Sequence, residues 1–212
     1  MNTDTIAVWA QVASAVFTAV IAIVAIWGDA IRRKLLPPNL ELRKHNFEGD
    51  LNIQRDGKKV IYYHLKVINT KRYMAHKVRV MCEALSRMTA DRETFQIEPF
   101  VVPIQMNWAH INFQELLPNV GPERIVDIGF LVEGADHFII SLITTPGNFK
   151  GQIGKGETLR FRLVATADNQ IKSKPLFLQI AWAGEFVFDS KEMSKHLVIS
   201  IVDSLGSDPQ ST

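Results

Sequence analysis

The chain has 212 residues, with 24 basic and 22 acidic side chains, and its formal net charge is +2. Cys82 is its only cysteine, which excludes an internal disulfide and a zinc site built from several thiolates. The positive surplus lies in residues 32–44, whose net charge is +4, whereas residues 45–212 are neutral. Nucleic-acid binding ordinarily uses a broad positive field, so no nucleic-acid partner is expected.

An apolar run without any charge extends from Ile6 to Trp27 and has a second tryptophan, Trp9, near its beginning. At about 1.5 Å per residue, a helix of this length crosses the roughly 30 Å of a hydrocarbon core. A helix of a soluble core would carry a polar face, and this run has none. We therefore expect residues 1–36 to be a transmembrane anchor. A cleaved signal peptide is disfavoured because no basic residue precedes Arg32.

Basic residues directly follow the apolar run, at Arg32, Arg33 and Lys34. Positive charges next to a span remain in the cytoplasm and are attracted to anionic lipid. The chain is thus predicted to cross a cytoplasmic membrane once, with its N-terminus outside and everything after Lys34 in the cytosol. The helix is expected to end at Pro37-Pro38, because proline has no N–H and restricts the residue before it.

Small side chains recur every four residues along the predicted span, at Ala10, Ser14, Thr18 and Ala22. Residues at this spacing share one side of a helix. Helices associate in lipid where small side chains allow close backbone approach. This side is a candidate surface for forming a homo-oligomer, although an alanine-rich span also produces such a pattern without association.

The hydrophobic period changes to two after the prolines, which predicts strands. Strands are expected at residues 39–45, 58–70, 76–85, 124–133, 137–144, 157–167, 175–184 and 197–202. Asp56-Gly57 is typical of a hairpin turn, and Asp189 with Glu192 has the form of a capping box for a short helix. Many short strands predict an antiparallel β-sandwich in residues 37–203, followed by a disordered tail at 204–212.

Two stretches resemble segments of immunoglobulin-like and fibronectin-like sandwiches. In "LKVINTKRYMAHKVRVMCE" a strand ends in a polar turn and an alanine leads into the next strand. "GKGETLRFRLVATADN" is similar to a late strand that is entered through a glycine-bearing turn. The resemblance implies an immunoglobulin-like fold and no particular activity, because such folds host many functions.

The sequence carries no common motif for catalysis or metal binding. The histidines stand at 45, 64, 76, 110, 137 and 196, and no two have the spacing of metal ligands on one element. His64 and His137 are expected at the surface or at strand edges. "GQIGKGET" is predicted to be a β-turn, because a phosphate loop needs Ser or Thr after its lysine and a following helix. We expect no enzyme, no metal and no cofactor.

Five residues of the predicted soluble domain have two interpretations each. Asp127, within "RIVDIGF", is either a buried carboxylate or an outward-facing strand residue. Trp108 and Trp182 either fill the core or contact a ligand or partner. Arg160 and Arg162 either solubilise a strand or line a basic pocket. Cys82 lies in an apolar stretch and is expected to be a buried thiol.

Two functions are compatible with these features. The first is a non-enzymatic, membrane-anchored adaptor whose β-domain binds another protein through its sheet edges or loops. The alternative is a ligand-gated membrane effector, in which the β-domain binds a nucleotide-type signal and the clustered helices perturb the bilayer. A concave basic pocket at Arg160 and Arg162 favours the effector, and a flat or acidic surface there favours the adaptor.

Overall fold

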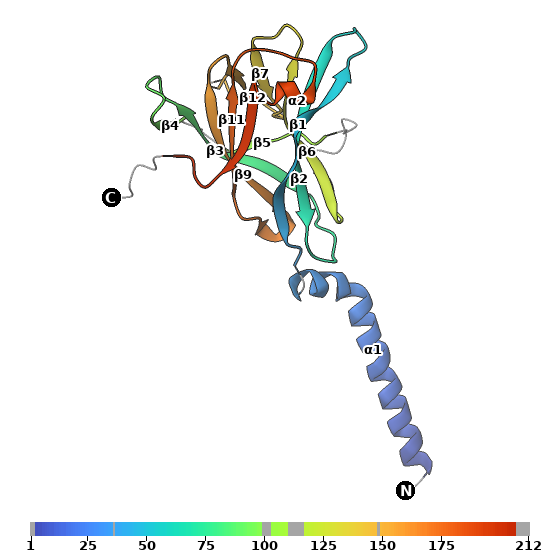
Figure 1. The fold of residues 1–212 in the computed structure, drawn as a ribbon. Coiled ribbons are helices and arrows are strands. Elements are labelled where there is room, and N and C mark those ends of the chain that lie inside the picture. The colour runs from blue at the N-terminus through green and yellow to red at the C-terminus, as the bar shows by residue number, and fades with distance from the viewer. Residues whose placement is uncertain (1–2, 36, 99–102, 110–116, 148, 207–212) are drawn as a thin grey trace, which may run out of the picture. The chain divides into compact units, whose positions relative to one another are not determined.

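The computed structural model describes residues 3–35, 37–98, 103–109, 117–147 and 149–206. The chain divides into two units, Met1–Pro38 and Asn39–Thr212. The first contains one long helix, and the second contains the strands (Figure 1).

The first unit consists of helix α1, Thr3–Leu35. Its segment Thr5–Gly28 is long and apolar enough to cross a membrane, and none of this apolar window is buried. Among the described residues this is the one helix with those properties. The helix continues past the apolar run and ends at Leu35, just before Pro37-Pro38, as predicted.

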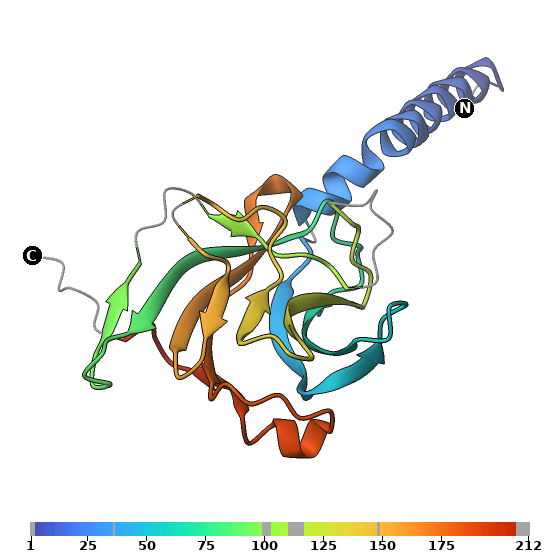
Figure 2. The ribbon, with the colours of Figure 1, turned by 90° about the horizontal axis from the view of Figure 1, so that it is seen from above.

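The second unit is mainly β and forms two antiparallel sheets (Figures 1 and 2). The first sheet has the order β1-β2-β6-β7-β8, with bounds Leu40–Ile53, Lys59–Asn69, Glu123–Val132, His137–Ile140 and Gln152–Gly154. The second has the order β12-β11-β9-β3-β4, with bounds Leu197–Val202, Leu176–Trp182, Thr158–Ala167, Arg79–Met88 and Phe95–Ile97. Two short strands extend the second sheet: β5 (Ile104–Gln105) pairs with β3, and β10 (Ile171–Lys172) pairs with β9.

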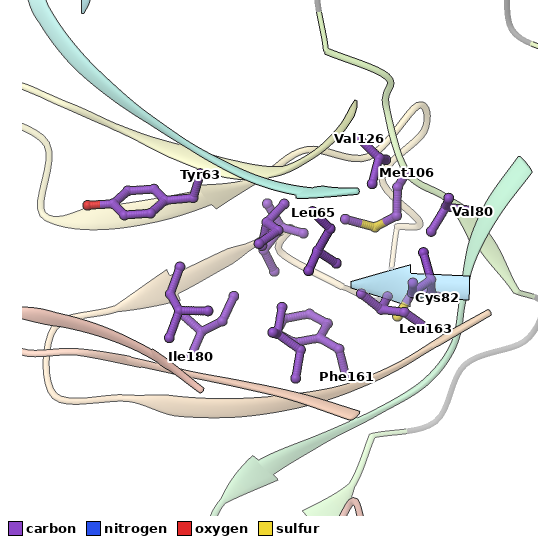
Figure 3. Close-up of a cluster of buried hydrophobic side chains, with 14 of the residues drawn as sticks. Tyr63, Leu65, Val80, Cys82, Met106, Val126, Phe161, Leu163 and Ile180 are labelled. Carbon is purple, nitrogen blue, oxygen red and sulfur yellow. The ribbon is translucent and has the colours of Figure 1, made fainter. Parts of the chain in front are cut away.

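The hydrophobic core lies between the two sheets, because alternate residues of each strand face the other sheet. Tyr63 and Leu65 reach it from the first sheet, and Phe161 and Ile180 reach it from the second (Figure 3). Cys82 is buried in the same cluster, as expected, and burial raises the pKa of its thiol to about 12. The period-two pattern of the sequence is therefore the pattern of burial.

Every segment predicted to be a strand contains one, and the two predicted turn and cap signals are also confirmed. Gly57 closes the β1–β2 hairpin with φ +84°. Asp189 caps the helix α2, Ser190–Met193, by accepting a hydrogen bond from the backbone N–H of Glu192 at 2.9 Å. Four strands of two or three residues were not predicted, namely β4, β5, β8 and β10.

The chain remains packed against the domain after β12. Leu205 is buried, and its carbonyl oxygen accepts a hydrogen bond of 2.6 Å from the Ser86 hydroxyl. The tail was predicted to begin at residue 204, and residues 207–212 of it lie outside the described part of the chain.

Candidate functional site: a histidine between two carboxylates

His64 lies in the middle of β2 and is only 4% exposed. Its neighbours Tyr63 and Leu65 enter the core, so His64 projects from the opposite, outer face of the sheet. Its Nε2 lies 3.2 Å from Oδ2 of Asp50 in β1, and its Nδ1 lies 2.7 Å from Oδ1 of Asp127 in β6. The Nδ1 contact has the distance of a hydrogen bond without its standard geometry. One imidazole thus separates two carboxylates from two different strands.

Both strands that flank His64 carry a bulge at this point. In β6, His64 is opposite Asp127 and Tyr63 is opposite Gly129, so the register skips Ile128. In β1, the register passes from Asn46 directly to Asp50. An extra residue bends its strand and re-aims the side chains beside it, which is why bulges are common next to functional sites.

The bulge in β1 is fixed by its glycine and by side-chain hydrogen bonds. Gly49 has φ +92°, and a Cβ there would lie 2.4 Å from Cγ2 of Ile61. The Asn46 amide donates a 2.7 Å hydrogen bond to Oδ1 of Asp50. From α2, the Ser190 hydroxyl donates to the carbonyl of Gly49 at 2.9 Å. Asp50 is therefore held with its second oxygen toward His64.

Asp127 is positioned by a segment that runs beside β6. Its backbone N–H donates to the carbonyl of Asn107 at 2.9 Å, and the Asn107 amide donates to the carbonyl of Leu142 at 3.0 Å. Trp108 forms a bridge with Val126. This segment brings Ala109 and Asp127 into the lining of one cleft.

The cleft above His64 has a volume of about 480 Å³. It is lined by Asp50, Leu51, Asn52, Tyr62, His64, Ala109 and Asp127. With two ionised carboxylates, the charge of this lining is −2 when the imidazole is neutral and −1 when it is protonated. Within the described part of the chain, the lining contains no lysine or arginine. The cleft is thus negative whichever form the imidazole takes.

The described residues of the cleft form a negative lining rather than a metal site. The two carboxylates contact opposite nitrogens of His64, so the three groups do not converge on a single point as metal ligands do. Among the described residues, no group of three or more His, Cys, Asp or Glu side chains has the geometry to hold a metal ion. None of the lining residues that the structure describes is a serine, threonine or cysteine that could act as a nucleophile.

The prediction that His64 lies at the surface or at a strand edge is wrong. β2 lies between β1 and β6, and His64 is 4% exposed, with its ring beside Asp50, Asp127 and Tyr62. Asp127, the carboxylate singled out from the sequence, is partly buried against His64. The sequence contained a second signal in Gly49, because β1 extends to Ile53 and a glycine inside a strand is typical of a bulge.

Trp108 and Trp182 lie in the hydrophobic core. The Trp182 indole N–H donates to the carbonyl of Asp136 at 3.2 Å. The Trp108 ring has the Arg124 guanidinium 5.8 Å from its centroid. Of the two interpretations, the observed positions correspond to core packing.

Arg160 and Arg162 lie on the outer face of β9 and do not line the cleft. The Arg160 guanidinium stacks 3.8 Å from the centroid of the Phe95 ring, and its Nε donates to Oε1 of the Gln179 side chain at 2.7 Å. Arg162 pairs with Glu83, with 3.2 Å between Nη1 and Oε2. Both cations are already engaged by neighbours on their own sheet.

The small residues and the basic residues predicted to belong to the anchor lie on one continuous helix, α1. Ala10, Ser14, Thr18 and Ala22 are exposed, and the Thr18 hydroxyl donates to the carbonyl of Ser14 at 2.8 Å. The basic residues 32–34 belong to the last turns of the helix. The histidine at position 110 lies outside the described residues.

A second polar cluster is centred on Arg87 in β3. Its Nε lies 2.5 Å from Oε1 of Glu98, and its Nη1 lies 2.5 Å from Oε2 of Glu157. Burial lowers the pKa of this guanidinium and the two carboxylates raise it, with a net rise. Cation and carboxylates satisfy one another, so the cluster is a structural ion-pair network.

No protein-family model matches the chain, and no curated protein matches it with significant similarity.

Proposed function

We propose that the chain is a single-pass membrane protein that holds an immunoglobulin-like β-sandwich at the cytoplasmic face of the membrane. The domain acts as a non-enzymatic adaptor and binds another protein through the cleft at His64. The observation that carries the proposal is this cleft, whose described lining sets two carboxylates against one imidazole and contains no lysine or arginine. A protein partner that supplies the missing positive charge completes the site.

The anchor is supported by the exposed apolar surface of α1. Residues Ile6, Phe17 and Ile26 are each at least half exposed, and such surface is stable in lipid and unstable in water. The basic residues 32–34 follow on one side only, which favours a cytosolic domain. An anchored domain meets membrane partners at a raised local concentration.

The ligand-gated effector needs a concave basic pocket for an anionic signal. Arg160 and Arg162 are paired with Gln179, Phe95 and Glu83, and the cleft at His64 is negative. These observations favour the adaptor.

A position-specific crosslinking experiment tests the adaptor proposal. A photoreactive amino acid is placed at Leu51, which is 45% exposed at the cleft, and at Ile97, which is 39% exposed on the other sheet. In membranes containing the full chain, we expect a discrete protein adduct from position 51 and none from position 97. Equal adducts, or no adduct, from the two positions contradict the proposal.

A further inference from the structure

We propose that the cleft at His64 binds the cationic side chain of a lysine or arginine presented by the partner protein. This inference rests on the proposed function and deepens it, because it names the chemistry of the bound group.

The first argument is charge. Asp50 and Asp127 lie on opposite sides of one imidazole, so even a protonated His64 neutralises only one of them. Two lysines of this sheet already pair with other carboxylates. Lys66 pairs with Glu123, and Lys59 pairs with Glu133. A partly enclosed negative site attracts a cation more strongly than an exposed carboxylate does, because the interaction is less screened by water.

The second argument is hydrogen-bonding capacity. Asp50 uses Oδ1 for Asn46 and Oδ2 for His64, and Asp127 uses Oδ1 for His64. An ionised carboxylate offers about four acceptor positions, so both groups retain acceptors for an incoming ammonium or guanidinium. Because bulges and backbone hydrogen bonds already fix these carboxylates, little order is lost when a ligand binds.

The third argument is the apolar part of the lining. Leu51, Ala109 and the ring of Tyr62 border the cleft. Tyr62 stacks on His64 with 6.4 Å between ring centroids and packs against Phe130 at 5.5 Å. Lysine and arginine carry an aliphatic stem below the charged head, and their heads are attracted to aromatic faces. The cleft therefore complements both parts of such a side chain.

The inference is tested with short peptides and the full chain in lipid nanodiscs. The probes are acetyl-Gly-Arg-Gly-amide, its lysine counterpart and a citrulline counterpart, which has the shape of arginine without its charge. Binding is followed by the NMR signals of His64. We expect the two cationic peptides to shift these signals saturably and the citrulline peptide to leave them unchanged.

Two substitutions and one control connect binding to the cleft. Asp50→Asn and Asp127→Asn each remove one charge without changing shape, and each is expected to weaken arginine-peptide binding by about tenfold. Asp56→Asn is the control, because Asp56 lies in the same hairpin but outside the cleft. The two side chains are equally accessible, since that of Asp56 is 54% exposed and that of Asp50 is 52% exposed. It should bind as the unmodified chain does.

The outcomes separate this inference from the proposed function. If citrulline binds as well as arginine, or both asparagine variants bind normally, the inference is overturned. The adaptor proposal then still stands if the Leu51 crosslink persists. If n-butylamine binds more tightly than the peptides, the ligand is a free amine. The inference that a partner protein supplies the cation is then overturned. If the peptides bind as expected while Leu51 gives no crosslink, the cation chemistry is supported and the adaptor proposal fails.

Discussion

Nδ1 of His64 and Oδ1 of Asp127 lie 2.7 Å apart at the point where the register between β2 and β6 skips a residue. The two strands are separated by about sixty residues of sequence. His64 and Asp127 continue the register in which Leu65 is opposite Val126, and the shift follows directly, before Tyr63 and Gly129. The pair therefore lies at the edge of a bulge, where side chains are re-aimed.

Replacing His64 by alanine should destabilise the domain. The substitution leaves Asp50 and Asp127 facing one another without the imidazole, and we expect a loss of about 1–3 kcal/mol in the free energy of unfolding. The measurement is urea unfolding of the full chain in detergent micelles, followed by tryptophan fluorescence. His76→Ala, at an exposed contact with Asn119, should change the value by less than about 0.5 kcal/mol. Equal effects of the two substitutions would show that the buried histidine has no structural role.

Gly49→Ala tests the geometry of the β1 bulge. Gly49 and Gly57 both have positive φ, +92° and +84°, so alanine is strained at either position. Only at Gly49 does the added Cβ also collide with Ile61, since nothing lies within 4 Å at Gly57. Gly57→Ala should cost about 1 kcal/mol, and Gly49→Ala should cost at least about 1 kcal/mol more. The same unfolding measurement applies, and equal costs would contradict the observed bulge.

How far the sequence predicted this fold depends on which elements are considered. Strands such as β2 and β9 were predicted because one of their faces is buried, which imposes a period of two on the sequence. β5 and β10 have two residues each, too few to establish any period. The order of strands in each sheet was not predicted either, because it depends on which faces pack together across long sequence separations.

The candidate site was predicted only in part, for a similar reason. Asp127 was conspicuous as a carboxylate among apolar residues. His64 was misassigned because alternation alone places it on a solvent-facing surface, whereas side chains from both neighbouring strands lie against its ring. Gly49 was the local sign of one bulge, but the partner that a bulged strand brings close depends on the register of the whole sheet.

Tyr63→Phe should change the alkaline stability of the domain. The Tyr63 hydroxyl is buried without a hydrogen-bond partner among the described residues, and burial raises the pKa of this phenol. The unfolded chain therefore releases the proton at lower pH than the folded chain, and stability falls as the pH rises above about 10. At neutral pH the substitution should be neutral or slightly stabilising, because an unsatisfied polar group is removed. Unfolding curves at pH 7 and 10.5 measure both effects. An equally steep alkaline loss in the variant, compared with the unmodified chain, would contradict this account.

Replacing Ser14 and Thr18 by leucine should weaken self-association of α1. The Thr18 hydroxyl already donates to the carbonyl of Ser14 within the helix, so the effect should come mainly from lost close approach between backbones. Crosslinking in membranes measures the fraction of oligomer. Val12→Leu with Val16→Leu is the control, since both valines are exposed on another side of the helix. Oligomer at unchanged levels after the Ser14 and Thr18 substitutions would assign association to the β-domain.

The orientation of the chain in the membrane needs a reporter other than Cys82. This thiol is buried, and its pKa of about 12 keeps it protonated and unreactive at neutral pH. Its protection from a reagent therefore reports folding rather than the side of the membrane. Two variants, each with one new cysteine in a Cys82→Ser background, avoid this ambiguity. Asn2→Cys lies before the helix, and Lys58→Cys lies in the exposed β1–β2 hairpin.

The membrane-anchored adaptor depends on the β-domain being cytosolic, and labelling these two cysteines in spheroplasts tests that most directly. A membrane-impermeant maleimide should label Asn2→Cys in intact spheroplasts, because the basic residues 32–34 keep the other side of the helix inside. Lys58→Cys should be labelled only after the membrane is permeabilised. Labelling of Lys58→Cys in intact spheroplasts, with Asn2→Cys protected, would reverse the orientation and contradict the proposed function.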